Sequence, residues 1–205
     1  MDLNPHDLLE IKCISDLISY SPLPDWVESS LNQAPFVVVR RARAEEGLVS
    51  VGIRGEKRNE RFAAFLPIKQ IQKQITPEQL AASENWKGSA KELFRHMDEV
   101  SLLMKKHSLT WGPTGSVGFE LASRKETVTE MSDLDLLIRA DGRFTQDFCR
   151  TINYDLKKVP IAIDVQVELP EGAFSLHEIV TTQEEKIVLR TMNGPMLRRI
   201  YLELK

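Results

Sequence analysis

Two aspartates have the residue type and spacing of a catalytic metal site. Asp133 and Asp135 stand two positions apart in a β-prone segment, so both side chains point to the same side of a strand. Two carboxylates that converge repel each other unless a cation lies between them. The pair therefore indicates a site for a hard cation such as Mg²⁺, although a solvated strand edge with two outward acids explains the same spacing.

A glycine-serine turn precedes this pair in the chain. Gly115 lets the backbone approach a ligand closely, Ser116 supplies a hydroxyl group, and residues 117–122 can begin a helix whose free N–H groups attract anions. An ordinary helix cap uses the same residue types. The turn lacks both the Gly-Lys-[Ser/Thr] ending of a P-loop and the Gly-x-Gly-x-x-Gly pattern. Together with the aspartates, it indicates a site that holds phosphate groups and a metal ion.

A third acid follows in a cleanly alternating segment, residues 161–168. The alternation places Asp164, Gln166 and Glu168 on one strand face and aliphatic residues on the other. We expect Asp164 to complete the metal site or to accept a proton from an attacking hydroxyl. A half-exposed strand with a polar face would show the same pattern.

The order of these features, a Gly-Ser turn, a helix and an Asp-x-Asp strand, resembles the nucleotidyltransferase fold of the polymerase-β type. Residues 111–122 and 132–136 are more narrowly similar to the phosphoribosyl-dephospho-CoA transferase of malonate decarboxylase, also called malonate decarboxylase holo-acyl-carrier-protein synthase. Other similar segments are spread along the chain, at 5–9, 39–41, 51–55, 76–80 and 189–191. Two features depart from the general nucleotidyltransferase pattern: the long gap between Ser116 and Asp133, and Thr114 where an apolar residue is usual.

The resemblance implies a reaction and its partners. The donor is 2′-(5″-triphosphoribosyl)-3′-dephospho-CoA, and the acceptor is a serine of the acyl-carrier protein subunit of malonate decarboxylase. In this scheme Asp133, Asp135 and Asp164 bind one or two Mg²⁺ ions, while Gly115 and Ser116 hold the departing pyrophosphate. Two alternatives stay open: another Mg²⁺-dependent nucleotidyltransferase that acts on a protein, nucleic acid or small molecule, or a non-catalytic partner-binding module with the same fold.

A cluster of basic residues is a candidate for contact with phosphates or with an acidic carrier protein. Between positions 40 and 61, seven basic residues face four acidic ones. Arg40 and Arg54 end two β-like segments, and Arg58 follows closely; guanidinium groups suit phosphate recognition through paired donors. A solvated surface with mixed ion pairs is the alternative explanation.

Composition limits the class of protein. The 205 residues are 42% hydrophobic, which is typical of a globular protein. No apolar run is long enough to span a membrane, and the first residues lack the layout of a signal peptide, so we expect a cytoplasmic enzyme without a membrane partner. The pI near 5.9 and the 7% aromatic content do not favour nucleic-acid binding. Cys13 and Cys149 have no zinc-ligand or disulfide spacing.

The order of elements predicts an α+β protein, because strands and helices mix without strict alternation. Strand-like runs at 36–40 and 48–54 predict a small β-containing N-terminal domain over residues 1–80. Thr76 and Pro77 are typical of a helix start, and helical spacing recurs within 88–107. We assign residues 81–205 to a nucleotidyltransferase-like catalytic domain with a mixed sheet and flanking helices.

Overall fold

The computed structural model describes residues 2–57, 59–141 and 143–199. Two compact units are present: Met1–Thr76 with Phe119–Thr127, and Pro77–Gly118 with Val128–Lys205. Each unit contains its own β-sheet, and helices accompany both, so the prediction of a mixed α+β protein is confirmed. Within the described ranges, no helix combines the length and the apolar character needed to cross a membrane.

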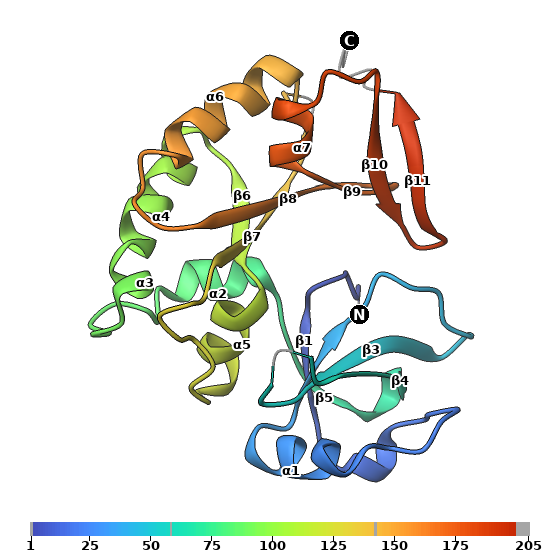
Figure 1. Ribbon diagram of the computed structural model, residues 1–205. Coiled ribbons are helices and arrows are strands. Elements are labelled where there is room, and N and C mark those ends of the chain that lie inside the picture. Colours follow the sequence, from blue (N-terminus) through green and yellow to red (C-terminus); the bar gives the residue numbers. More distant parts are fainter. Residues whose placement is uncertain (1, 58, 142, 200–205) are drawn as a thin grey trace. The chain divides into compact units, whose positions relative to one another are not determined.

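The N-terminal unit is built on an antiparallel sheet of five strands in the order β4-β3-β2-β1-β5 (Figure 1). The strands are β1 (Leu8–Ile11), β2 (Phe36–Val39), β3 (Leu48–Arg54), β4 (Arg61–Pro67) and β5 (Ile71–Ile75). Helix α1 (Asp25–Gln33) contributes Val27 and Leu31 to a core formed with one face of this sheet. Two short 3₁₀ helices, Ile14–Asp16 and Ile68–Gln70, lie in the connections.

The C-terminal unit contains a six-stranded sheet in the order β11-β10-β9-β8-β7-β6. Its strands are β6 (Thr110–Pro113), β7 (Leu134–Arg139), β8 (Ile163–Leu169), β9 (Gly172–Ser175), β10 (Lys186–Thr191) and β11 (Gly194–Arg199). Only β7 and β8 pair in parallel, joined by the crossover helix α6 (Gln146–Leu156) that a parallel connection requires. This parallel pair is where the predicted acids lie.

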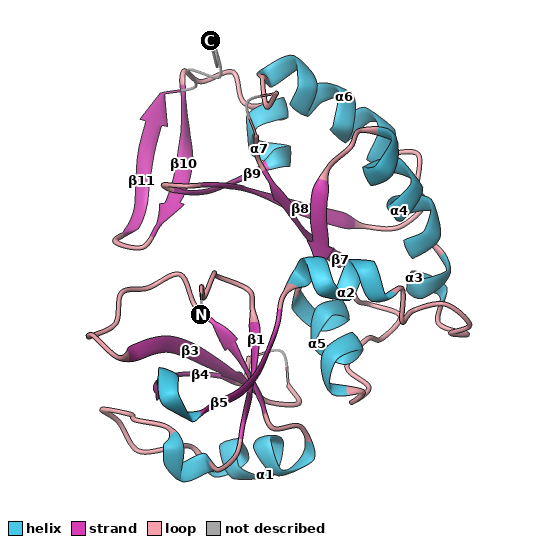
Figure 2. Ribbon diagram, turned by 180° about the vertical axis from the view of Figure 1, so that it is seen from behind, coloured by secondary structure: helices cyan, strands magenta, loops and turns pink. Residues whose placement is uncertain are grey.

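The remaining helices are α2 (Pro77–Ser83), α3 (Glu92–Arg95), α4 (Met97–Lys106), α5 (Gly115–Ser123) and α7 (Leu176–Thr181). Figure 2 shows α4 and α6 along one side of β7 and β8. The helical spacing within 88–107 corresponds to two helices, since α3 ends at Arg95 and α4 begins at Met97, and residues 88–91 are not helical. The predicted helix start at Thr76 and Pro77 agrees with α2.

The two faces of the C-terminal sheet differ because side chains alternate along each strand. Leu134, Leu136 and Ile138 of β7 are buried on one face, together with Val165 and Val167 of β8. The other face carries Asp135 and Asp164 in register, followed along β8 by Gln166 and Glu168. The face of Asp135 also carries buried Leu137, so one strand pair separates an apolar core face from a face on which acids predominate, called here the polar face.

Candidate active site

The centre of the polar face is a pair of acids on neighbouring strands. Asp135 of β7 lies directly opposite Asp164 of β8 in the parallel ladder. Adjacent strands are about 4.8 Å apart and paired residues share a face, so the two carboxyl groups are near neighbours. Asp135 is half-buried and Asp164 is exposed. The structure therefore brings together two of the three predicted metal ligands.

Asp133 has a different position from the one that its spacing predicts. Strand β7 begins at Leu134, so Asp133 lies just before the strand and is exposed at the edge of a cavity. Among the residues that the structure describes, no three His, Cys, Asp or Glu side chains form a group able to hold a metal ion. The strand register thus gives an acid pair, Asp135 and Asp164, with Asp133 outside it.

Gly115 brings helix α5 against the Asp135 carboxylate. Its φ of +57° is in the left-handed region, and a Cβ atom at this position would lie 1.8 Å from Oδ2 of Asp135. The Thr114 backbone N–H donates to the Asp135 carbonyl oxygen at 2.8 Å, which fixes the turn to the strand. Ser116, the next residue of α5, is buried. Only glycine allows this close approach of the acid to the first turn of a helix.

The same face carries positive charge farther along the strands. Arg139 of β7 is opposite Glu168 of β8, and its Nε donates to Glu78 Oε1 of α2 at 2.7 Å. Gly112 of β6 allows α2 to pack here, because a Cβ atom at this position would lie 2.0 Å from the Pro77 carbonyl group. Sequence analysis did not single out Arg139, although its position four residues after Asp135 places both on one strand face.

The predicted basic contacts belong to the N-terminal unit. Arg40 Nη1 donates to Ser50 Oγ at 3.4 Å, and its aliphatic stem lies over Gly52. Arg54 ends β3 opposite Arg61 of β4. By strand alternation, Arg40 and Arg54 are on the sheet face opposite the hydrophobic core. The third predicted residue, Arg58, lies outside the described residues.

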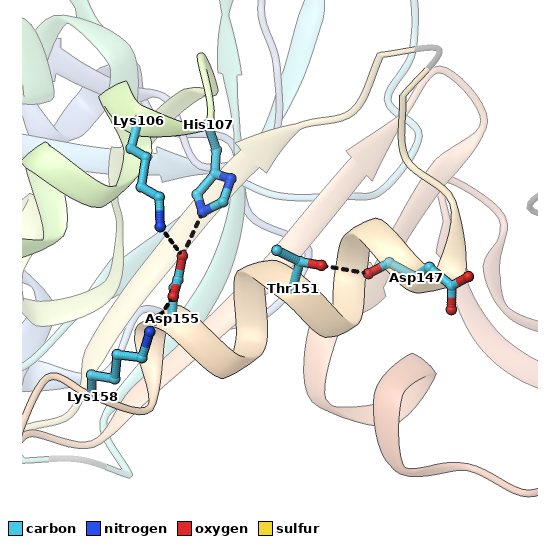
Figure 3. A network of polar contacts seen from close by, with 6 residues as sticks. All are labelled: Lys106, His107, Asp147, Thr151, Asp155 and Lys158. Carbon is cyan, nitrogen blue, oxygen red and sulfur yellow. Dashed lines mark hydrogen bonds and ion pairs between the residues drawn. The ribbon is translucent and has the colours of Figure 1, made fainter.

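A second carboxylate site joins α4 to α6 (Figure 3). Buried Asp155 accepts from Lys158 Nζ at 2.6 Å, and from Lys106 Nζ and His107 Nε2 at 2.8 Å each. The hydrogen bonds from Lys106, Lys158 and His107 hold the pKa of Asp155 well below its ordinary value. Farther along α6, the Thr151 hydroxyl donates to the Asp147 carbonyl oxygen at 3.0 Å. The charge of Asp155 is therefore balanced within the protein.

The cysteine on α6 is not a candidate nucleophile. Cys149 is buried, and burial raises the pKa of its thiol to about 12. A thiol that remains protonated at neutral pH is a weak nucleophile and a weak metal ligand. We interpret Cys149 as a core residue of α6.

Two family descriptions match the chain. Residues 4–77 match the family described as phosphoribosyl-dephospho-CoA transferase MdcG N-terminal domain. Residues 79–200 match the family described as phosphoribosyl-dephospho-CoA transferase MdcG C-terminal domain. Together, the two matches extend over most of the sequence.

Curated proteins named phosphoribosyl-dephospho-CoA transferase are similar over nearly the full length. The protein of Pseudomonas putida is 36% identical over 193 residues, which cover 94% of this chain and 92% of the relative. That of Klebsiella pneumoniae (strain 342) is 34% identical over 194 residues, covering 94% and 93%. That of Azotobacter vinelandii is 32% identical over 196 residues, covering 94% and 91%. No solved structure matches the chain.

Proposed function

The chain belongs to the phosphoribosyl-dephospho-CoA transferase family, and from this premise we propose the complete reaction that it catalyses. The donor is 2′-(5″-triphosphoribosyl)-3′-dephospho-CoA, and the acceptor is a serine of the acyl-carrier protein subunit of malonate decarboxylase. The serine oxygen attacks the phosphorus next to the ribose and the bond to the β-phosphate breaks. Pyrophosphate leaves, and the carrier retains a phosphodiester-linked prosthetic group.

The observation that carries this proposal is the position of Asp135. Its carboxylate is opposite Asp164 and against Gly115 at the start of α5. Phosphoryl-type transfer depends on positioning and on neutralising phosphate charge more than on covalent chemistry. Helix N–H groups at Gly115 and Ser116 can hold the departing phosphates, and the acids beside them can hold the cation that those phosphates carry.

Magnesium is the proposed cofactor because the donor set fits a hard cation. Asp135 and Asp164 offer carboxylate oxygens from adjacent strands. Within the described ranges, the side chains of Asp133 and Asp164 have no ion pair or hydrogen bond that would compete for a metal. We assign all three acids to Mg²⁺, with Asp133 joining the pair from the segment before β7. Bound Mg²⁺ would neutralise the charge that develops on the attacking and leaving oxygens.

The arrangement of the C-terminal unit supports a nucleotidyltransferase fold of the polymerase-β type. Helix α5 follows the Gly-Ser turn, β7 carries Asp135, and the neighbouring strand β8 supplies Asp164. This is the order of elements that the sequence resemblance implies. Arg40, Arg54 and Arg58 are the proposed contacts for phosphates of the donor or for an acidic surface of the carrier protein.

A mass measurement on the carrier tests the function. The full chain is incubated with Mg²⁺, the triphosphoribosyl donor and the apo-carrier, and we expect the carrier to gain the mass of one phosphoribosyl-dephospho-CoA group. The same assay with ATP as donor separates this reaction from ordinary nucleotidyl transfer. No mass increase with the triphosphoribosyl donor, for a chain that is folded by circular dichroism, would refute the proposal.

A further inference from the structure

A cavity of about 880 Å³ opens beside Asp133 in the C-terminal unit. It is lined by the segment around α3, by residues 128–133 before β7, and by residues 160–162 before β8. Binding sites for small molecules and cofactors have volumes of roughly 300–1,000 Å³. This cavity therefore has the size of a ligand site, and it borders the proposed metal site through Asp133.

Part of the cavity lining, called here the floor, is apolar. Leu93 of α3 and Val128 are buried, and Ile161 is half-buried. Met131 projects at the edge with 90% of its surface exposed. The flexible thioether side chain of Met131 can adapt to the faces of flat ligands. The floor and Met131 together suit a planar group such as a purine ring.

The lining carries three acids and two cations, a balance that does not favour a bare polyphosphate. Both cations are bonded to backbone carbonyl groups: Lys91 Nζ to Val128 O at 3.3 Å and Arg95 Nη2 to Ala90 O at 2.7 Å. Three acids, Glu92, Glu130 and Asp133, line the same cavity. Carboxylates accept hydrogen bonds from amino and hydroxyl groups and repel phosphate oxygens. An uncharged ligand rich in donors fits this lining.

The proposed donor molecule contains an uncharged portion, rich in hydrogen-bond donors, next to the reacting phosphate. The triphosphate is attached to a ribose, which is joined to the adenosine of dephospho-CoA; both sugars and the purine are uncharged. We propose that the cavity binds the ribosyl-adenosine portion of the donor, with the purine over the apolar floor and the hydroxyl and amino groups toward the acids. The diphosphate and pantetheine then extend away from the cavity. This inference rests on the proposed function for the identity of the donor.

The test fills the cavity and measures binding without transfer. Ala90 lines the cavity and is exposed, so Ala90→Trp places an indole in the cavity without disturbing the core. The matched control is Ala82→Trp, at another exposed alanine, in α2, that is not among the residues lining the cavity. Dephospho-CoA is titrated by calorimetry in the absence of Mg²⁺ and carrier protein, so the result is independent of whether transfer occurs.

We expect A90W to weaken dephospho-CoA binding about tenfold or more and A82W to leave it unchanged. M131A, which removes an exposed side chain, should weaken it severalfold. Saturation-transfer NMR on the wild type should show the strongest effects on the adenine protons. An unchanged affinity in A90W, an equal loss in A82W, strongest saturation of the pantetheine methyl groups, or no binding of dephospho-CoA by the wild type would each overturn the inference.

Binding of inorganic tripolyphosphate with Mg²⁺ gives a second readout of the same variants. The cavity is assigned to the nucleoside, so A90W should bind Mg²⁺-tripolyphosphate as the wild type does. A parallel loss of both ligands would show that the substitution acts on the acid pair or on folding and not on a nucleoside site, and would contradict the assignment. Failure of the transfer assay alone, with the binding pattern intact, would refute the proposed reaction and leave the cavity assignment standing.

Discussion

The C-terminal unit contains two carboxylate sites of different composition. Asp155, between α4 and α6, is buried and accepts hydrogen bonds from two lysines and a histidine (Figure 3). Asp135 and Asp164, on the polar face of the sheet, are near neighbours of like charge. In the first site two lysines and a histidine bond one carboxylate; in the second, two acids stand in register on adjacent strands.

This difference indicates what each site is for. Removing one partner of a buried, fully paired carboxylate is destabilising, and such a carboxylate has little capacity left for a ligand. Two acids brought together at an accessible face reduce stability unless a cation binds. The comparison therefore assigns Asp155 to the scaffold and the acid pair to ligand binding.

The largest effect is expected from neutralising one member of the acid pair. Asp135→Asn keeps the shape of the side chain and removes the charge that holds Mg²⁺, so the transfer rate should fall by about 10³-fold. The measurement is the rate of carrier modification at saturating donor, followed by mass spectrometry. Asp147→Asn, at an exposed acid of α6, is the matched control and should retain the wild-type rate. Wild-type transfer by D135N would end the assignment of the pair to catalysis.

A smaller loss is expected when Gly115 is replaced by alanine. The added Cβ would lie 1.8 Å from Asp135 Oδ2 and the residue has a positive φ, so the carboxylate must move or the turn must change. We expect roughly a hundredfold loss of rate and a decrease of about 1–2 kcal/mol in the free energy of unfolding.

Gly88 provides the control for this substitution. It also has a positive φ, of +83°, but a Cβ there would meet no atom within 4 Å. Gly88→Ala should therefore lower the free energy of unfolding, because of the positive φ, and retain the transfer rate. Equal activity losses in G88A and G115A would show that backbone strain, and not contact with Asp135, explains the effect.

Asp155→Asn should affect stability and leave activity nearly unchanged. The substitution leaves Lys106, His107 and Lys158 without their carboxylate, so we expect a clear decrease in Tm at neutral pH and an almost wild-type transfer rate for the folded protein. D147N again serves as the control, since it breaks one exposed ion pair on the same helix. A large loss of activity in folded D155N would remove the distinction between the two sites.

The difference in stability between the wild type and D155N should depend on pH with a definite sign. The pKa of Asp155 in the folded protein is lower than the ordinary value of 3.8, so its contribution to stability is complete above that value and is lost as pH falls through the folded-state pKa. The Tm difference between wild type and D155N should shrink in strongly acidic solution. A difference that increased below the ordinary pKa would contradict the pairing.

The acid pair and the Asp155 site differ in how much of each the sequence reveals. Asp135 and Asp164 can be predicted because each belongs to a short alternating segment, and Gly115 stands in a recognisable turn. The parallel register that brings the acids together comes from pairing of β7 with β8, which no local pattern specifies. The spacing of the two aspartates predicts that Asp133 lies in the strand, but β7 begins one residue later, at Leu134.

The Asp155 site was missed because its members are far apart in the sequence. Lys106 and His107 are 49 and 48 residues from Asp155, and only Lys158 is local. Strand β6 was also missed, since Gly112 and Pro113 are typical of turns. Its place at the sheet edge depends on pairing with β7 and on α2, whose Pro77 packs against Gly112. Sequence analysis thus identified the residues with local signals and not the contacts made by tertiary packing.

The smallest effect, and the most selective one, is the response of stability to Mg²⁺. If the acid pair binds the ion, a concentration of about ten times Kd should stabilise the wild type by about 1.4 kcal/mol and raise Tm by a few degrees. D155N should start from a lower Tm and show the same increase, because its acid pair is intact. D135N should show no increase. Stabilisation of all three proteins by equal amounts would mean that Mg²⁺ acts as a general salt, and the difference between the Asp155 site and the acid pair would then have no consequence for metal binding.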